Sequence, residues 1–108
     1  ELAEQIGTEI RTFSGKTRVG IVYGGVGYQD QSRMLRNGVE ILVACPGRLE
    51  DLISQKLVGL SSVEHIVLDE ADRMADMGFM PAVRRILNQT AEKRQTMLFS
   101  ATFCDSFL

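Results

Sequence analysis

Three carboxylates fall within four residues at Asp69-Glu70-Ala71-Asp72, directly after the apolar stretch Ile66-Val67-Leu68. Like charges at this spacing repel one another unless a cation or another partner lies nearby. A carboxylate at a strand end can hold a hydrated Mg²⁺, which binds one or two carboxylates together with waters and nucleotide phosphates. The spacing therefore predicts a phosphoryl-transfer site. Asp69 would bind Mg²⁺ through water, and Glu70 would orient or deprotonate the water that attacks a γ-phosphate.

An acidic helix start is the alternative for the same four residues. Glu70 and Asp72 would then complement the positive N-terminal end of the helix dipole and have no catalytic role. The tetrapeptide alone leaves both interpretations open.

Three other short segments also follow apolar stretches that we expect to be strands. They are Tyr23-Gly24-Gly25, Cys45-Pro46-Gly47-Arg48 and Ser100-Ala101-Thr102. Taken singly, each has a structural explanation, because paired glycines form turns, Pro-Gly begins helices, and Ser or Thr caps them. In a parallel sheet, however, working residues lie just beyond the carboxyl ends of the strands. We therefore expect these segments and the acid cluster to meet at one edge of a sheet.

The tripeptide Gly15-Lys16-Thr17 copies the end of a phosphate-binding P-loop but does not complete one. The full pattern requires glycine at position 10, which is Ile10, and it lies between a strand and a helix. Here the tripeptide lies between an expected helix and an expected strand, so Lys16 is expected to be a solvated turn residue.

Hydrophobic periodicity predicts strands that alternate with helices, which is the pattern of an α/β fold with a mainly parallel sheet and flanking helices. No hairpin signal joins two strands, so crossover connections are expected. The apolar stretch from Ile41 predicts a strand buried on both faces. Strands are expected at residues 18–23, 40–44, 63–68 and 95–99, and helices at 2–13, 29–36, from 46 onward, 70–77 and 82–87.

Composition is that of a globular protein, with 44% apolar and 24% charged residues among 108. The length suits one small domain, yet a doubly wound domain usually needs more residues, and the chain begins at Glu1 without Met. We therefore expect a fragment. No apolar run approaches the roughly 20 residues that cross a bilayer, so no membrane segment is expected.

Two cysteines without a CxxC pattern and one histidine indicate neither a zinc site nor a disulfide framework. The cytoplasm therefore fits best as location, and the nucleus is the alternative. A net charge of -2 lacks the basic excess typical of nucleic-acid binders, so any RNA binding must be argued from motifs.

The order and spacing of these segments resemble the DEAD-box RNA helicases up to Thr102. The segments that carry the resemblance are Glu1-Leu2-Ala3 with Gln5 for the end of motif Ia, Tyr23-Gly24-Gly25 for the GG element, Cys45-Pro46-Gly47-Arg48-Leu49 for motif Ib, Val67 to Met74 for motif II, and Ser100-Ala101-Thr102 for motif III. Several motifs in register make coincidence a poor explanation.

The resemblance implies an incomplete RecA-like domain of an ATP-dependent RNA helicase that uses ATP and Mg²⁺. It implies that Asp69 positions the metal, that Glu70 polarises the attacking water, and that Asp72, Ser100 and Thr102 couple nucleotide state to RNA binding. It places sequence-independent contacts to the RNA backbone at Gly24, Gly25, Pro46, Gly47 and Arg48.

The chain also departs from the family pattern. The phosphate-binding motif I, the Q motif and the second RecA-like domain are not in the sequence, and Cys45 replaces the usual threonine with a weaker hydrogen-bonding group. We therefore expect the isolated chain to be inactive, and to associate with itself through an unpaired edge at residues 96–100. The alternative function is a non-catalytic RNA-binding or protein-binding remnant. A DNA-directed ATPase fits Tyr23-Gly24-Gly25 and Pro46-Gly47-Arg48 less well.

Overall fold

The computed structural model describes residues 2–25 and 27–102. Glu1, Val26 and residues 103–108, which include part of the expected motif Ia and Cys104, lie outside the described residues. The chain divides into two compact units, Glu1–Val58 and Gly59–Leu108, and each is described by itself. None of the helices formed by the described residues is long and apolar enough to cross a membrane.

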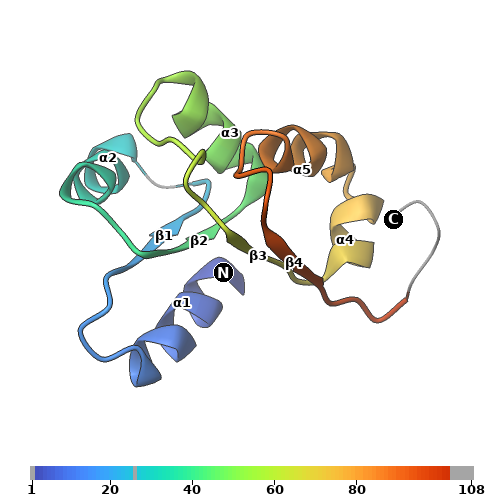
Figure 1. Cartoon of the computed structure of the whole chain (residues 1–108), viewed down its shortest axis with the longest axis horizontal. Helices are drawn as coiled ribbons and strands as arrows, with labels where there is room; N and C mark the ends of the chain where they lie inside the picture. Colours follow the sequence, from blue (N-terminus) through green and yellow to red (C-terminus); the bar gives the residue numbers. More distant parts are fainter. Residues whose placement is uncertain (1, 26, 103–108) are drawn as a thin grey trace. The chain divides into compact units, whose positions relative to one another are not determined.

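The first unit contains two parallel strands and three helices (Figure 1). Strand β1 pairs with β2 in a register that runs from Val19↔Ile41 to Val22↔Ala44. The elements are α1 (Leu2–Phe13), β1 (Val19–Val22), α2 (Tyr28–Asn37), β2 (Ile41–Ala44) and α3 (Pro46–Ser54). The crossover through α2 makes the two strands parallel, as the absence of a hairpin signal predicts.

Local chemistry sets where these helices begin and end. Helix α2 ends at Gly38, whose φ of 87° suits glycine and whose N–H bonds to the Leu35 carbonyl. Helix α3 begins at Pro46, where the fixed φ of proline is tolerated because the missing N–H has no partner there. The fully buried side chains of Val22 and Leu52 form the centre of this unit's core.

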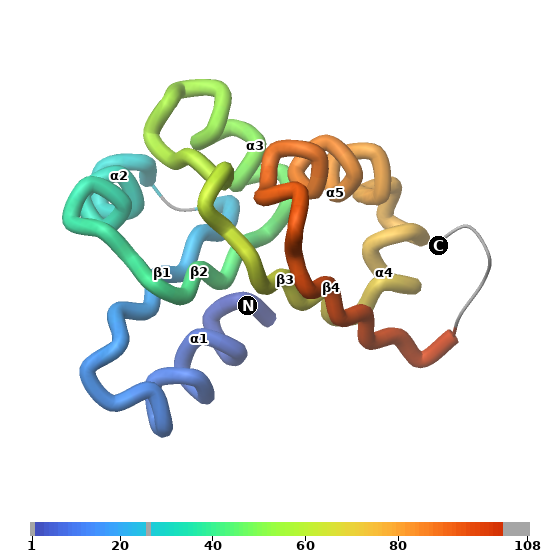
Figure 2. Tube along the Cα trace, in the orientation of Figure 1, coloured from blue at the N-terminus to red at the C-terminus, as the bar shows by residue number. Residues whose placement is uncertain are grey.

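The second unit repeats the strand, helix and strand order. It consists of β3 (His65–Leu68), α4 (Ala71–Asp76), α5 (Met80–Leu87) and β4 (Gln95–Leu98), and the tube in Figure 2 follows this path from yellow to red. Strands β3 and β4 are parallel, from His65↔Gln95 to Leu68↔Leu98. Ala71 is fully buried, which ties the start of α4 to this unit's core.

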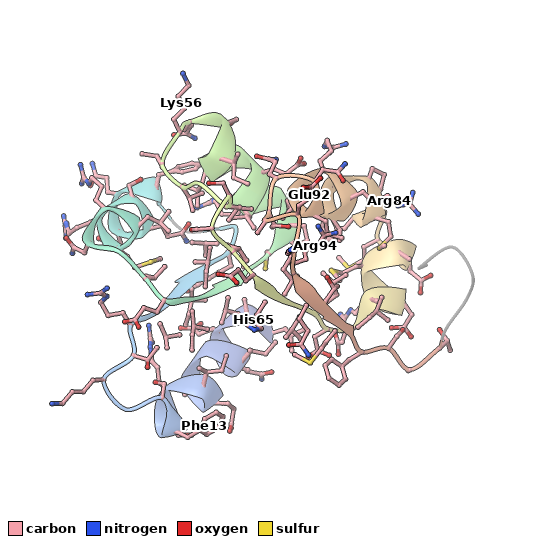
Figure 3. The ribbon with its side chains drawn as sticks, in the orientation of Figure 1. Phe13, Lys56, His65, Arg84, Glu92 and Arg94 are labelled. Carbon is pink, nitrogen blue, oxygen red and sulfur yellow. The ribbon has the colours of Figure 1, made fainter. Side chains whose placement is uncertain are left out.

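The structure confirms the α/β class with parallel pairing and corrects two details. The described residues form two sheets of two strands each, where one sheet was expected, because no strand among them bridges the two pairs. Strand β2 is half-buried along its length, so its expected burial on both faces was wrong, and β3 alternates between exposed and half-buried residues. The side chains in Figure 3 include His65, the exposed first residue of β3.

Gly20 lies where β1 meets α2, and we expect the substitution Gly20→Ala to destabilise the first unit. A Cβ at this position would lie 2.8 Å from the Val39 methyl and closer still to the Met34 sulfur. Overpacking of this kind costs about 1–3 kcal/mol. Denaturant unfolding should show the loss in Gly20→Ala. The control Gly59→Ala, whose Cβ meets no atom within 4 Å, should unfold near the wild-type midpoint.

Among the described residues each strand of the β3–β4 sheet pairs on one side only, and Met97 and Phe99 are 39% and 53% exposed. Such an edge is a template for association. We expect the isolated 108-residue chain to associate in sedimentation, and Met97→Lys to reduce that association. The control Met77→Lys changes a residue that is 61% exposed and outside the strands. A stable wild-type monomer, or equal effects of the two lysines, would contradict this role for β4.

Candidate functional site

In the second unit, the acid cluster and the Ser100-Ala101-Thr102 segment lie side by side. Parallel pairing of β3 with β4 brings their carboxyl ends together. The Ala71 N–H donates to the carbonyl of Phe99, the residue before the second segment, at 3.1 Å, and the Asp72 N–H donates to the Ser100 hydroxyl at 3.0 Å. The two segments that the sequence predicted to cooperate are therefore in direct contact.

Both segments line an open hollow of about 480 Å³. This volume falls within the range of roughly 300–1,000 Å³ that is usual for small-molecule pockets. The lining residues are Asp69, Glu70, Asp72, Arg73, Phe99, Ser100 and Ala101. Acidic, basic and hydroxyl groups thus meet in one place large enough for part of a nucleotide.

Asp72 is the most connected carboxylate of the cluster. Its Oδ2 accepts a bond from the Thr102 hydroxyl at 3.2 Å, and the Ser100 hydroxyl donates to the Thr102 carbonyl at 2.5 Å. Desolvation raises the pKa of the Asp72 carboxyl, but hydrogen bonds from Ser100, the Arg73 amide and Thr102 outweigh it. The net pKa lies below the ordinary value of 3.8, so Asp72 is ionised at neutral pH.

Glu70 adopts a left-handed backbone conformation, with φ 53° and ψ 48°. The helix expected from residue 70 therefore begins at Ala71, because Glu70 occupies the position just before it. This conformation costs a non-glycine residue about 1–2 kcal/mol. The Glu70 carboxylate lies 3.8 Å from the guanidinium of Arg73, whose side chain is 72% exposed. Exposed pairs of this kind contribute little, so the Glu70 carboxylate is held weakly in place.

Asp69 is exposed, and its Oδ1 accepts the Glu70 N–H at 2.9 Å. The expectation that the three carboxylates repel unless a cation or another partner is near agrees with the structure, because each one has such a partner: a backbone amide for Asp69, Arg73 for Glu70, and the Thr102 hydroxyl for Asp72. Among residues 2–25 and 27–102, no group of three or more His, Cys, Asp or Glu side chains is placed to hold a metal. Mg²⁺ does not require such a group, because it binds through few carboxylates and several waters. The exposed Asp69 in the hollow fits that pattern.

In the first unit, the glycine turn and the start of α3 are neighbours. The Cys45 N–H donates to the Val22 carbonyl at 3.0 Å, which holds the end of β2 against the end of β1. Gly25 has φ 86°, a conformation that favours glycine. A Cβ at Gly24 or Gly47 would meet no atom within 4 Å, so open space borders the backbone at both positions.

Arg48 projects from the first turn of α3 and is half-buried. Its Nη1 donates to Gln31 Oε1 at 3.0 Å, and its guanidinium carbon lies 4.2 Å from the centroid of the Tyr28 ring. The Gln31 Nε2 donates in turn to the Tyr23 carbonyl at 3.0 Å. Gln31, which is 5% exposed, therefore joins the glycine turn to Arg48.

Tyr28 and Asp51 extend this network on the surface. The Tyr28 hydroxyl donates to Asp51 Oδ2, and Gln55 donates to Asp51 Oδ1. The bond to Asp51 raises the pKa of the Tyr28 hydroxyl, and the bond from Tyr28 lowers the pKa of the Asp51 carboxyl.

Sequence analysis missed Gln31 and Tyr28. The signal for Gln31 was its spacing of three and four residues from Met34 and Leu35, which places it on the same face of the helix. No comparable signal marks Tyr28.

The structure brings the four expected segments together in pairs. Within each unit the two strand ends are adjacent, and a common edge for all four segments stays a prediction. The Gly15-Lys16-Thr17 segment forms a turn between α1 and β1, in which the Thr17 N–H bonds to the Ser14 carbonyl. Its exclusion as a P-loop is confirmed.

Comparison with known proteins identifies the family. The DEAD/DEAH box helicase family model matches residues 1–107. The chain belongs to the DEAD/DEAH box helicase family.

Among curated relatives, it is 49% identical over 109 residues to DEAD-box ATP-dependent RNA helicase 52A of Oryza sativa subsp. japonica, covering 95% of this chain and 18% of that protein. The chain thus spans less than a fifth of the length of this relative.

Two solved structures of DEAD-box type proteins have closely similar folds. A hypothetical ATP-dependent RNA helicase from Sulfolobus tokodaii matches with a TM-score of 0.88 and 43% identity, covering 96% of this chain and 32% of that one. A DEAD box protein from Methanococcus jannaschii matches with a TM-score of 0.90 and 36% identity, covering 98% and 30%. The resemblance inferred from the motifs and the RecA-like α/β fold class are therefore confirmed.

The Asp72 network makes a prediction about titration. We expect the Asp72 carboxyl to titrate below 3.8, and Thr102→Val, which removes the hydroxyl but keeps the shape, to raise its pKa. A carboxyl whose pKa is depressed in the folded protein stabilises the fold above its ordinary pKa, and this stabilisation is lost as pH falls through the folded value.

Carbon-13 NMR titration of the Asp72 carboxyl measures this shift directly. Thr102→Ser keeps the hydroxyl and should retain the low pKa. An unchanged Asp72 pKa in Thr102→Val would show that the Thr102 hydroxyl does not hold the carboxylate.

Proposed function

We propose that this chain is part of an ATP-dependent RNA helicase that couples Mg-ATP hydrolysis to RNA binding and to local duplex unwinding or RNP remodelling. The observation that carries the proposal is the bonded contact between Asp69-Glu70-Ala71-Asp72 and Ser100-Ala101-Thr102 at a hollow of about 480 Å³. Membership of the DEAD/DEAH box helicase family supports the same function, as does similarity to relatives that are ATP-dependent RNA helicases.

The hydrolytic role is assigned to Asp69 and Glu70. Bound at Asp69 through water, Mg²⁺ would supply charge neutralisation to the phosphates. Glu70 would accept a proton from, or orient, the water that attacks the γ-phosphate. Its weak pairing with Arg73 supports this assignment, because the carboxylate can turn toward a ligand at small cost.

Coupling is assigned to Asp72, Ser100 and Thr102. The Ser100 hydroxyl accepts the first-turn amide of α4 and also donates to the Thr102 carbonyl, so it touches both segments at once. A nucleotide in the hollow that moves either segment would strain these bonds. A shift of these segments would then also move the end of β4 and any group that contacts residues 100–102.

RNA binding is assigned to the first unit. Gly24, Gly25 and Gly47 leave room for a backbone to approach, Pro46 sets the start of α3, and Arg48 offers a guanidinium. Amides and a guanidinium suit phosphate oxygens and read no bases, so binding would be independent of sequence. The thiol of Cys45 would contribute less than a threonine hydroxyl at the same place.

The proposed reaction needs more than this chain. A phosphate-binding loop and a second RecA-like domain would complete the ATP and RNA sites, and the 108 residues alone are expected to be inactive. The proposed setting is the cytoplasm, with the nucleus as the alternative.

Glu70→Gln tests the assignment. In the full-length protein, this substitution should lower RNA-stimulated ATP hydrolysis by about 10²-fold or more, because general-base contributions are typically 10²–10⁴. Nucleotide binding should stay close to wild type, since the side chain keeps its size. The measurements are phosphate release with saturating RNA and fluorescent-nucleotide binding.

The matched control is Glu64→Gln, an exposed residue just before β3 in the same unit. It should hydrolyse ATP at the wild-type rate. Turnover retained in Glu70→Gln, or lost equally in the control, would refute the role assigned to Glu70.

A further inference from the structure

Gln31 is the most buried polar side chain that the proposed reaction leaves unused. It is 5% exposed and comes from α2, the crossover helix between β1 and β2. It is also the only buried polar or charged residue among those that the structure describes. Burying an amide costs free energy unless its groups are hydrogen-bonded, so a residue of this kind needs partners.

Both ends of the Gln31 amide have such partners. Nε2 donates to the Tyr23 carbonyl at 3.0 Å, and Oε1 accepts from Arg48 Nη1 at 3.0 Å. A carbonyl can only accept and a guanidinium can only donate, so the two partners fix which way the amide points. The side chain is therefore a bridge with one possible orientation.

The two hydrogen-bond partners of Gln31 belong to the two segments that are proposed to contact the RNA backbone. Tyr23 precedes the glycine turn, and Arg48 lies in the first turn of α3. Strand pairing aligns the ends of β1 and β2 but does not fix the direction of the Arg48 side chain. The Gln31 bridge adds that constraint, and the Tyr28 ring also contacts the guanidinium, with its centroid 4.2 Å from the guanidinium carbon.

We propose that Gln31 is a positioning residue for RNA-backbone binding, which acts by holding Arg48 at a fixed place relative to the Tyr23-Gly24-Gly25 turn. Phosphate recognition by a guanidinium depends on geometry, because its donors form a rigid fork. A fixed Arg48 also loses less side-chain entropy when RNA binds. This inference rests on the proposed RNA-binding function.

The test uses the full-length protein, a labelled single-stranded uridine oligonucleotide and a non-hydrolysable ATP analogue. Gln31→Leu keeps the size of the side chain and removes both bonds, and it should weaken RNA binding about tenfold. In RNA-stimulated ATPase assays it should raise the KM for RNA more than it lowers kcat. The control Gln29→Leu changes an exposed glutamine of the same helix and should bind RNA like wild type.

A double-mutant cycle separates positioning from general structural support. If Gln31 acts through Arg48, then Gln31→Leu should weaken RNA binding much less in an Arg48→Ala background than in wild type. An undiminished effect in that background, an equal loss in Gln29→Leu, or unchanged affinity in Gln31→Leu would overturn the inference.

Gln31→Glu covers the case in which Gln31→Leu does not fold. It keeps an acceptor for Arg48 and replaces the donor to the Tyr23 carbonyl with an oxygen, which breaks one side of the bridge. Reduced RNA affinity in a folded Gln31→Glu supports the inference, and wild-type affinity overturns it. RNA-stimulated ATPase in the wild type is measured first. If the wild type shows no RNA-stimulated ATPase activity, the proposed function is refuted. If the wild type shows this activity but the Gln31 variants bind RNA with wild-type affinity, only this inference is refuted.

Discussion

Hydrogen bonding between parallel strands is the constraint on which both sites depend. A parallel pair places the carboxyl ends of both strands at the same edge of the sheet. Residues that follow the two strands therefore lie close together, even before their side chains form any bond. Pairing of Leu68 with Leu98 brings Asp72 to Ser100, and pairing of Val22 with Ala44 brings Tyr23 to the start of α3. Each unit then adds side-chain bonds that the pairing alone does not supply.

The acid cluster shows how local geometry changes the meaning of a charge pattern. Three carboxylates in four residues would repel one another without partners, and the structure gives each its own: a backbone amide for Asp69, Arg73 for Glu70, and the Thr102 hydroxyl for Asp72. The lowered pKa of Asp72 is a result of that arrangement. A charge pattern therefore predicts that a site exists, and only the backbone shows how its charges are satisfied.

Much of the fold could be predicted from periodicity and from turn residues, because apolar spacing, Gly38 and Pro46 act locally. The acid cluster and the Ser100 to Thr102 segment were also predictable, since both follow apolar strands. The partial burial of β2 could not be predicted in this way. The burial of a strand depends on the residues that pack against it, and these residues lie elsewhere in the sequence. The conformation of Glu70 was not predictable either, since the left-handed region is unusual for any residue other than glycine.

Gln31 was missed for a related reason, and it shows how the two units differ. A polar residue in a polar helix gives only a weak sign of burial, here its spacing from Met34 and Leu35, until its partners, Tyr23 and Arg48, are placed in space. Both of its bonds are part-buried, like the bond from the Asp72 N–H to the Ser100 hydroxyl, so they compete less with water than exposed bonds do. The bond from the Thr102 hydroxyl to Asp72 is exposed, so a ligand can disturb it at small cost. A part-buried bridge fits the proposed positioning of Arg48, and an exposed bond fits the proposed response to a nucleotide.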